Sequence, residues 1–180
     1  MDFFHGIELG DNAPDEINVV VENCKGSYNK LEYDREKFVF RLDRVLYSPV
    51  YWSFEYGFVP QTWEGDDDPL DIGVLITNPT FPGCIIRARP IGVLKMQDEN
   101  GIDNKIISVA IKDPVFAHDH AYTTIKDIPP HTLREIKEFF EIYKRLEPKK
   151  WVKFKAWEGA TEAKKIILEA AKAYKKKFKH

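Results

Sequence analysis

The stretch WEGDDDPLDIGVLI, residues 63–76, joins a dense group of acidic residues to an apolar run. Three adjacent aspartates, Asp66, Asp67 and Asp68, are followed after a proline by Asp71. Aspartates are common in solvated turns. Here, however, the proline stiffens the turn, and the apolar run that follows predicts a buried strand. The stretch therefore indicates four carboxylates held at the start of a strand.

Short apolar or alternating segments on both sides of this stretch predict further β-strands. They are bounded by Gly, Pro, Asn or Asp and cover residues 17–22, 29–34, 36–44, 70–76, 84–96 and 104–111. In the segment EKFVFRLDR we expect Phe38, Phe40 and Leu42 to share one face. The sequence around Asn100 and Gly101 predicts a hairpin turn.

The last third of the chain has a helical period. TLREIKEFFEIYKRLE, residues 132–147, opens with a capping box of Thr132 and Glu135 and includes Lys144, and a second helix is predicted over residues 161–178. Short strands followed by helices predict an α+β, mainly β fold, in which a small barrel or strongly curled sheet carries two principal helices. With no break in composition, residues 1–180 are expected to form a single domain.

Composition excludes several classes of protein. A net charge of −2 argues against a general nucleic-acid binder, and no apolar stretch approaches the roughly 20 residues that cross a bilayer. The start of the chain, MDFFHGIELG, has no secretory pattern. Cys24 and Cys84 have no paired metal-ligand spacing and are expected to be free thiols in the cytoplasm. We therefore expect a cytoplasmic protein that binds neither nucleic acid nor membrane.

Acidic and basic residues elsewhere in the chain complement the aspartate run. Asp98 and Asp103 flank the predicted hairpin turn, which a barrel could bring beside Asp71. Oxygen ligands that converge from separate loops suit Mg²⁺ or Mn²⁺. A calcium EF-hand is excluded because its sixth loop position needs glycine.

Basic residues recur beside these acids. Lys30 and Glu32 share one strand face. Any single arginine, such as Arg44, is more often a surface residue, but Arg44, Lys105 and Lys144 together favour an anionic substrate. Carboxylates for metals and cations for phosphates predict a site for a phosphate-bearing substrate.

Several segments resemble one family. GDDDPLDI resembles the D-x-D-P-x-D signature of the soluble family I inorganic pyrophosphatases. From about Ile17 to Glu158 other segments resemble the family in the same order: VVVENCKGSYNKLEYD, LDRVLYSP with EYGFVPQTW, RPIGVLKMQDENGIDNK and FFEIYKRLEPKKWVKFKAWEGA. The resemblance implies a small closed OB-like barrel with flanking helices, hydrolysis of pyrophosphate to two orthophosphates, and a homo-oligomer of hexamer type.

The resemblance also implies roles for individual residues. Several Mg²⁺ ions, replaceable by Mn²⁺ or other divalent ions, would be held by Asp66, Asp71, Asp103 and Asp98, with Glu22 and Glu32 in outer positions. Asp68 would orient or deprotonate the attacking water, and the other catalytic residues would be Tyr56, Lys30 and Arg44. The phosphates would be held by Lys30, Arg44, Tyr56, Lys105, Tyr143 and Lys144.

The sequence departs from the family pattern near the substrate. Trp52 stands where a tyrosine is usual, Ser53 replaces a proline, and Glu55 replaces Asn or Asp. Trp52 is expected either to face the phosphates or to belong to the core. If the aspartate run is extended, Asp66 and Asp68 point together and Asp67 points away.

Two other functions remain open on sequence grounds. A phosphoesterase or nuclease could use the same carboxylates on a larger substrate. An OB-type binding module could use the lysine-rich end, TEAKKIILEAAKAYKKKFKH, to bind nucleic acid, although a solvated helix face is the simpler interpretation. His118 and His120 are expected in a surface loop.

Overall fold

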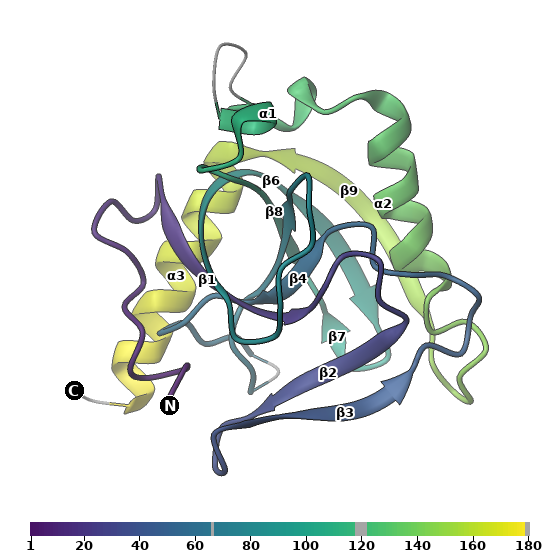
Figure 1. Cartoon of the computed structure of the whole chain (residues 1–180), viewed down its shortest axis with the longest axis horizontal. Coiled ribbons are helices and arrows are strands. Elements are labelled where there is room, and N and C mark those ends of the chain that lie inside the picture. The colour runs from purple at the N-terminus through teal and green to yellow at the C-terminus, as the bar shows by residue number, and fades with distance from the viewer. Residues whose placement is uncertain (66, 118–121, 179–180) are drawn as a thin grey trace.

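The structure, a computed structural model, describes residues 1–65, 67–117 and 122–178 (Figure 1). Its strands form one seven-stranded sheet and a separate two-stranded sheet of β2 and β3. The strands are β1 (Ile17–Asn23), β2 (Asn29–Asp34), β3 (Val39–Val45), β4 (Glu55–Phe58), β5 (Asp71–Leu75), β6 (Ile85–Asp98), β7 (Gly101–Ile102), β8 (Lys105–Ala110) and β9 (Val152–Gly159). The helices are α1 (Pro114–Ala117), the 3₁₀ turn η1 (Ile125–Asp127), α2 (Pro130–Ile142) and α3 (Ala160–Phe178).

The large sheet closes into a barrel because β1 and β6 pair with each other. The strand order is β1-β4-β5-β8-β6, and the antiparallel pairing of β6 with β1 completes the ring, seen end-on in Figure 1. A register shift between Pro90 and Gly92 interrupts the β6–β8 ladder, and such bulges bend a strand. A side chain at Gly92 would lie 2.8 Å from the backbone oxygen of Glu158. The prediction of a mainly β, OB-like barrel with flanking helices is confirmed.

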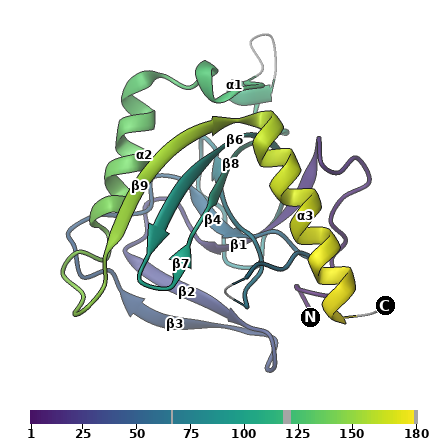
Figure 2. The same cartoon turned by 180° about the vertical axis from the view of Figure 1, so that it is seen from behind.

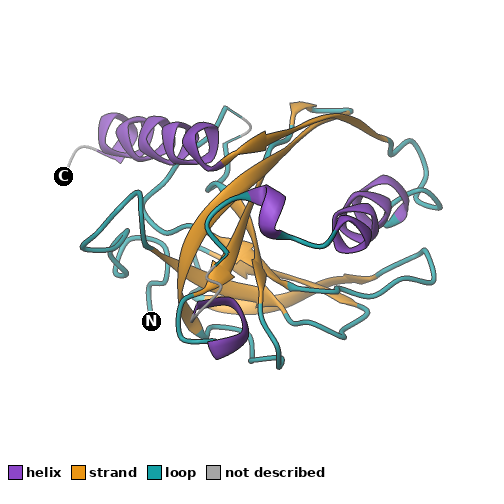
Figure 3. Ribbon diagram, turned by 90° about the horizontal axis from the view of Figure 1, so that it is seen from above, coloured by secondary structure: helices purple, strands orange, loops and turns teal. Residues whose placement is uncertain are grey.

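Two long helices cover separate parts of the barrel (Figure 3). β9 runs along β6 and leads directly into α3, as Figure 2 shows. α3 buries Ala163, Ile167 and Ala170 against the barrel core. α2 buries Ile136, Phe139 and Phe140 in a second, aromatic part of the core. The two predicted helices are thus confirmed as principal elements.

The predicted start and end of α2 were wrong. The helix begins at Pro130, two residues before the proposed capping box of Thr132 and Glu135. Proline suits this position because the N–H groups of the first turn have no helical partner. α2 ends at Ile142, whose backbone oxygen accepts a hydrogen bond from the Ser48 hydroxyl at 2.5 Å. Lys144 therefore lies in the turns after the helix and not within it.

The predicted strands are present except for the start of β3, and β4, β7 and β9 lie outside the predicted ranges; the hairpin turn at Asn100 and Gly101 is confirmed by the β6–β7 pairing. Phe38 has a φ of 56° and lies in the turn before β3, so it does not share a strand face with Phe40 and Leu42. β4 was not predicted because its four residues, EYGF, are too short to show a period. β9 was expected only from the family resemblance.

Trp52 belongs to the core. Its side chain is 1% exposed and stacks on Tyr56 with ring centroids 4.7 Å apart. Its indole N–H donates to the backbone oxygen of Asn29 at 2.9 Å. Phe139 of α2 lies at the same centroid distance of 4.7 Å. Trp52 therefore supports Tyr56 from behind and does not face a substrate.

Among the described residues, no helix combines the length and the apolar character that crossing a membrane requires.

Replacing Trp52 should cost stability first. We expect Trp52→Ala to lower the free energy of unfolding by about 3–5 kcal/mol, the usual cost of removing a buried aromatic ring. Tyr51→Ala is the matched control, because Tyr51 is 53% exposed and should cost less than about 1 kcal/mol. Urea unfolding followed by circular dichroism measures both. A Trp52→Ala variant as stable as the control would contradict the core assignment.

Candidate active site

One cavity of about 740 Å³ gathers the sequence-predicted site residues. It lies between the β2–β3 hairpin, the start of β5, the β6–β7 turn and the segment after α2. Its lining includes every predicted site residue that the structure describes: Glu22, Lys30, Glu32, Arg44, Tyr56, Asp68, Asp71, Asp98, Asp103, Lys105, Tyr143 and Lys144. Asp66 lies outside the described residues, as do His118 and His120.

The barrel topology explains why residues far apart in sequence meet here. β5 and β8 are parallel neighbours, and each begins with a site residue, Asp71 and Lys105. β6 runs antiparallel to β8 and ends with Asp98. The starts of β5 and β8 and the end of β6 therefore meet at one edge of the sheet. Asp103 follows in the turn that leads back to β8.

The cations of the cavity are paired with its carboxylates. The buried Lys105 ammonium bonds both Asp71 and Asp103. The Lys144 ammonium lies 2.8 Å from a carboxylate oxygen of Asp98. Burial is the largest single influence and disfavours the charged form of Lys105, but Asp71, Tyr56 and Asp103 together outweigh it and hold the Lys105 pKa well above its usual value. The cations therefore offset the mutual repulsion of the acids.

At the rim of the cavity, cations are also paired with carboxylates. Lys30 pairs with Glu32. The Arg44 guanidinium bonds Asp43 and lies 2.8 Å from a carboxylate oxygen of Glu147. These cations line the same cavity as the carboxylates. An anionic substrate that carries metal ions would therefore contact both kinds of group.

The donor set of the cavity fits a hard divalent metal. As the side chains lie, no three His, Cys, Asp or Glu residues within 1–65, 67–117 and 122–178 are arranged to hold a metal ion. However, Asp71 and Asp103 already converge on one positive group, the Lys105 ammonium. Carboxylate oxygens that surround a positively charged group are also suitable ligands for Mg²⁺ or Mn²⁺.

Burial changes the protonation of other groups in the cavity. Burial raises the pKa of Glu22 to about 8, with a further contribution from Asp71, while the Tyr33 N–H that Glu22 accepts at 2.7 Å lowers it. Burial also raises the pKa of Asp103. For Tyr56 and Tyr143, burial raises the pKa above the normal value, so both phenols stay protonated and can donate hydrogen bonds.

Asp67 and Asp68 lie in a turn, so the extended arrangement is wrong for these two residues, and the part of the expectation that concerns Asp66 lies outside the described residues. The Glu64 N–H donates to the backbone oxygen of Asp68 at 2.8 Å, and Asp67 has a left-handed φ of 65°. Aspartate tolerates this conformation better than most residues. The Asp67 side chain is exposed and bonds Lys177 at 2.6 Å, whereas Asp68 lines the cavity. Asp67 therefore does face away, but because of the turn and not of strand alternation.

Several cavity residues were not singled out from the sequence. They are Asn23, Arg35, Asp43, Glu99, Asn100, Glu147 and Lys150. Glu99 has a clearly shifted pKa. Burial opposes its charge, but hydrogen bonds from Lys150, at 2.7 Å, and from the Trp151 N–H lower its pKa to about 2. Glu99 directly follows Asp98 in the sequence, so its position next to a predicted metal ligand could have identified it as a site residue.

Glu55, one of the departures from the family pattern, lies in the interior. It is fully buried and accepts hydrogen bonds from the Thr80 N–H at 2.8 Å and from the Lys25 N–H at 3.3 Å. It therefore fixes two loops to β4 and is not a rim residue.

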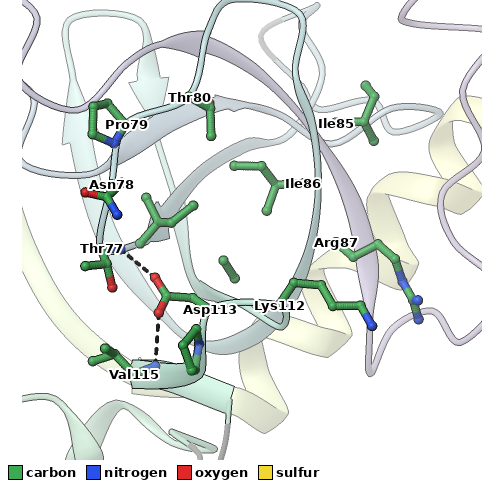
Figure 4. A pocket seen from close by; sticks show the side chains of 13 residues that line it. Thr77, Asn78, Pro79, Thr80, Ile85, Ile86, Arg87, Lys112, Asp113 and Val115 are labelled. Carbon is green, nitrogen blue, oxygen red and sulfur yellow. Dashed lines mark hydrogen bonds between the residues drawn. The ribbon is translucent and has the colours of Figure 1, made fainter.

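A second cavity of about 650 Å³ lies elsewhere on the barrel (Figure 4). Its walls are mainly apolar side chains such as Ile86 and Val115. Asp113 accepts hydrogen bonds from the N–H groups of Thr77, at 2.6 Å, and of Val115, at 3.0 Å (Figure 4). Its lining includes Arg87, Lys112 and Asp113 but shares no described residue with the carboxylate cavity, so the two cavities are separate.

The raised pKa of Glu22 predicts a pH-dependent stability in the presence of chelator. Between its unfolded pKa of 4.5 and its folded pKa of about 8, the folded chain holds a proton that the unfolded chain lacks. The contribution of the Glu22 carboxyl group to the free energy of unfolding is therefore greatest below pH 4.5. It falls by at most about 1.4 kcal/mol per pH unit up to pH 8. Urea unfolding between pH 5 and 8 should show this fall in the wild type relative to Glu22→Gln. The exposed Glu36→Gln is the control and should follow the wild type; a Glu22→Gln curve parallel to the wild type would contradict the assignment.

Comparisons with known proteins agree with this geometry. A family model described as inorganic pyrophosphatase matches residues 19–175. An inorganic pyrophosphatase of Haloferax volcanii is 45% identical over 99% of this chain and 99% of its own length. One from a Nostoc species is 48% identical over 90% of this chain and 94% of its own.

A solved structure is similar throughout. The crystal structure of inorganic pyrophosphatase from Thermus thermophilus superposes with a TM-score of 0.93 at 39% identity, covering 97% of this chain and 99% of that one. The carboxylate cavity, the barrel and these relatives lead to one conclusion: the chain belongs to the inorganic pyrophosphatase family.

Proposed function

We propose that this chain hydrolyses inorganic pyrophosphate to two orthophosphates by direct attack of a metal-activated water, with several Mg²⁺ ions held by its carboxylates. Family membership supports the reaction. The observation that carries the mechanism is one cavity that acids, ammonium groups, two guanidinium groups and the phenols of Tyr56 and Tyr143 all line. The acids suit metal ions, and the other groups suit phosphate oxygens.

The acidic residues would hold the metal ions and the attacking water. Asp71, Asp98 and Asp103, which line the cavity, would be inner ligands together with Asp66, and Glu22 and Glu32 would take outer positions. Bound Mg²⁺ supplies the charge that lowers the pKa of the attacking water and neutralises the phosphates. The Asp68 carboxylate, at the cavity wall, orients this water and accepts its proton as a general base.

The basic residues and phenols would bind and orient the phosphates. Lys105 and Lys144 have flexible four-carbon stems, so their ammonium groups can leave the carboxylates and bind phosphate oxygens. Lys30 and Arg44 bind from the hairpin side. Tyr56 and Tyr143 donate their hydroxyl protons without ionising, as their raised pKa values favour. These groups stabilise charge on the leaving phosphate.

We further propose that the chain forms one domain and assembles with copies of itself, with a hexamer expected. A sheet that links β1 near the start to β9 near the end supports one domain. Large exposed apolar side chains, at Tyr28, Tyr47, Phe81 and Val115, supply contact surface for assembly. Light scattering of the purified chain tests the assembly. Two free cysteines support a reducing, cytoplasmic setting.

Removal of divalent metal should abolish activity. Orthophosphate release from pyrophosphate should disappear in chelator and return with excess Mg²⁺, because the proposed ligands are all oxygens. Ca²⁺ should inhibit, because its longer bonds and looser coordination misplace the attacking water. Nitrophenyl phosphate and DNA serve as controls for a phosphoesterase or nuclease and should be hydrolysed far more slowly. Full activity in chelator would end the proposal.

The three adjacent aspartates should differ sharply when each is changed to asparagine. Asp67→Asn should change kcat by less than about threefold, since the group is exposed and asparagine also accepts a left-handed backbone. Asp68→Asn should lower kcat by roughly 10²-fold or more, the scale of losing a general base. Asp66→Asn should mainly raise the Mg²⁺ concentration needed for activity. Steady-state kinetics across a Mg²⁺ titration separates the three, and equal damage from Asp67→Asn and Asp68→Asn would refute these roles.

A further inference from the structure

Trp63, which precedes the aspartate turn, is fixed to both ends of the chain. Its backbone N–H donates to the Ala170 oxygen of α3 at 3.0 Å. Its ring packs edge-to-face on Phe178 at 5.1 Å and lies 5.9 Å from the ring of Phe4. The N- and C-terminal segments lie side by side in Figures 1 and 2. The indole is therefore held by elements outside the cavity.

Two cations lie over this indole. The Lys177 ammonium, from the last turn of α3, is 3.9 Å from the ring centroid of Trp63. The Arg35 guanidinium, from the turn after β2, is 4.9 Å from the same centroid. Tryptophan offers the best aromatic face for a cation, so each contact favours a defined position for a long side chain.

The same two cations hold the aspartate turn. Lys177 bonds the Asp67 carboxylate at 2.6 Å, and this bond lowers the pKa of Asp67. Arg35 lies 3.1 Å from a carboxylate oxygen of Asp68 and bonds the backbone oxygen of Asp67 at 3.4 Å. Cations from two remote elements thus act on two adjacent residues, one of which lines the cavity.

Each of these contacts is weak when taken alone. Exposed ion pairs and exposed cation–π contacts contribute little individually. Here, however, the indole restricts each cation before it meets its carboxylate, so less side-chain freedom is lost in each pair. Adjacent like charges would otherwise favour opening of the turn.

We propose that Trp63, Arg35 and Lys177 form a positioning clamp that holds the turn at Asp67 and Asp68 in the shape in which metal ions bind beside Asp71. The inference rests on the proposed metal-dependent hydrolysis. It makes Lys177 a positioning residue and gives one lysine of the C-terminal helix a role in the site.

The direction in which the Mg²⁺ requirement changes when Lys177 is replaced distinguishes the clamp from simple charge repulsion. A cation near a metal site repels the metal, so removing the Lys177 charge alone would lower the Mg²⁺ concentration needed for activity. Removing a positioning contact does the opposite, because the turn must then be ordered when metal binds. The two explanations predict changes of opposite sign.

The test compares Lys177→Met with Lys176→Met, a change at the exposed neighbour on the same helix. Lys177→Met should raise the half-saturating Mg²⁺ concentration about threefold to tenfold and leave kcat at saturating Mg²⁺ within about twofold. Calorimetric titration with Mg²⁺, without substrate, should show the same loss of affinity. Lys177→Arg, which keeps a cation on the indole, should restore the wild-type value, and Lys176→Met should match the wild type.

Each contrary outcome overturns the clamp. If Lys177→Met had a lower Mg²⁺ requirement than the wild type, Lys177 would act only by repelling the metal. If the requirement were unchanged, Lys177 would be a solvated lysine with no role in the site. A lower melting temperature with an unchanged Mg²⁺ affinity would show a purely structural role. Failure of the proposed function itself would show separately, as a wild-type chain that releases no orthophosphate from pyrophosphate with Mg²⁺.

Discussion

Strand β6 is hydrogen-bonded along almost all of its length, and the rest of the molecule depends on this pairing. One edge of β6 pairs first with β1 and then with β9, while the other edge pairs with β8 and β7. A strand that is shared in this way must curl, and the irregularity at Pro90 and Gly92 allows it to do so. The ring closure, the path of β9 into α3 and the position of Asp98 at the end of β6 all follow from this one strand.

The second constraint is electrostatic. A barrel mouth lined with carboxylates is unfavourable unless the charges are offset, because like charges a few ångströms apart repel strongly in a poorly solvated space. Four of the acids are paired with cations: Lys105 lies between Asp71 and Asp103, Lys144 pairs with Asp98, and Arg35 pairs with Asp68. These ion pairs offset much of the repulsion at this edge of the barrel.

Much of the fold was readable from the sequence because its strands have strong local patterns. β1, β5 and β8 are apolar runs bounded by turn residues, and α3 has a clear helical period. The errors occur where tertiary contacts override local signals. α2 starts at Pro130 because a proline fits a first turn, although Thr132 and Glu135 offered a good capping box. β4 exists because β1 and β5 pair with it on both sides, which four residues of sequence do not reveal.

The candidate site was predicted largely through the family resemblance, and the structure brings its described residues into one cavity. The aspartate turn escaped prediction, since Asp67 has a left-handed backbone and is contacted by Arg35 and Lys177, which are remote in sequence. The placement of Trp52 was also open, because a tryptophan is compatible with a core and with a binding surface. Only its contacts with Tyr56 and Phe139 decide the question.

The ammonium group between Asp71 and Asp103 has a consequence for how the protein matures. Small metal-dependent folds such as zinc fingers stay unfolded until their metal arrives. In this chain Lys105 supplies one positive charge from within the polypeptide, so the repulsion between Asp71 and Asp103 is partly offset as soon as β5 and β8 pair. A newly made chain can therefore complete its barrel before any metal binds at these carboxylates, and under the metal-dependent hydrolysis proposed above a shortage of metal would lower its activity without unfolding it.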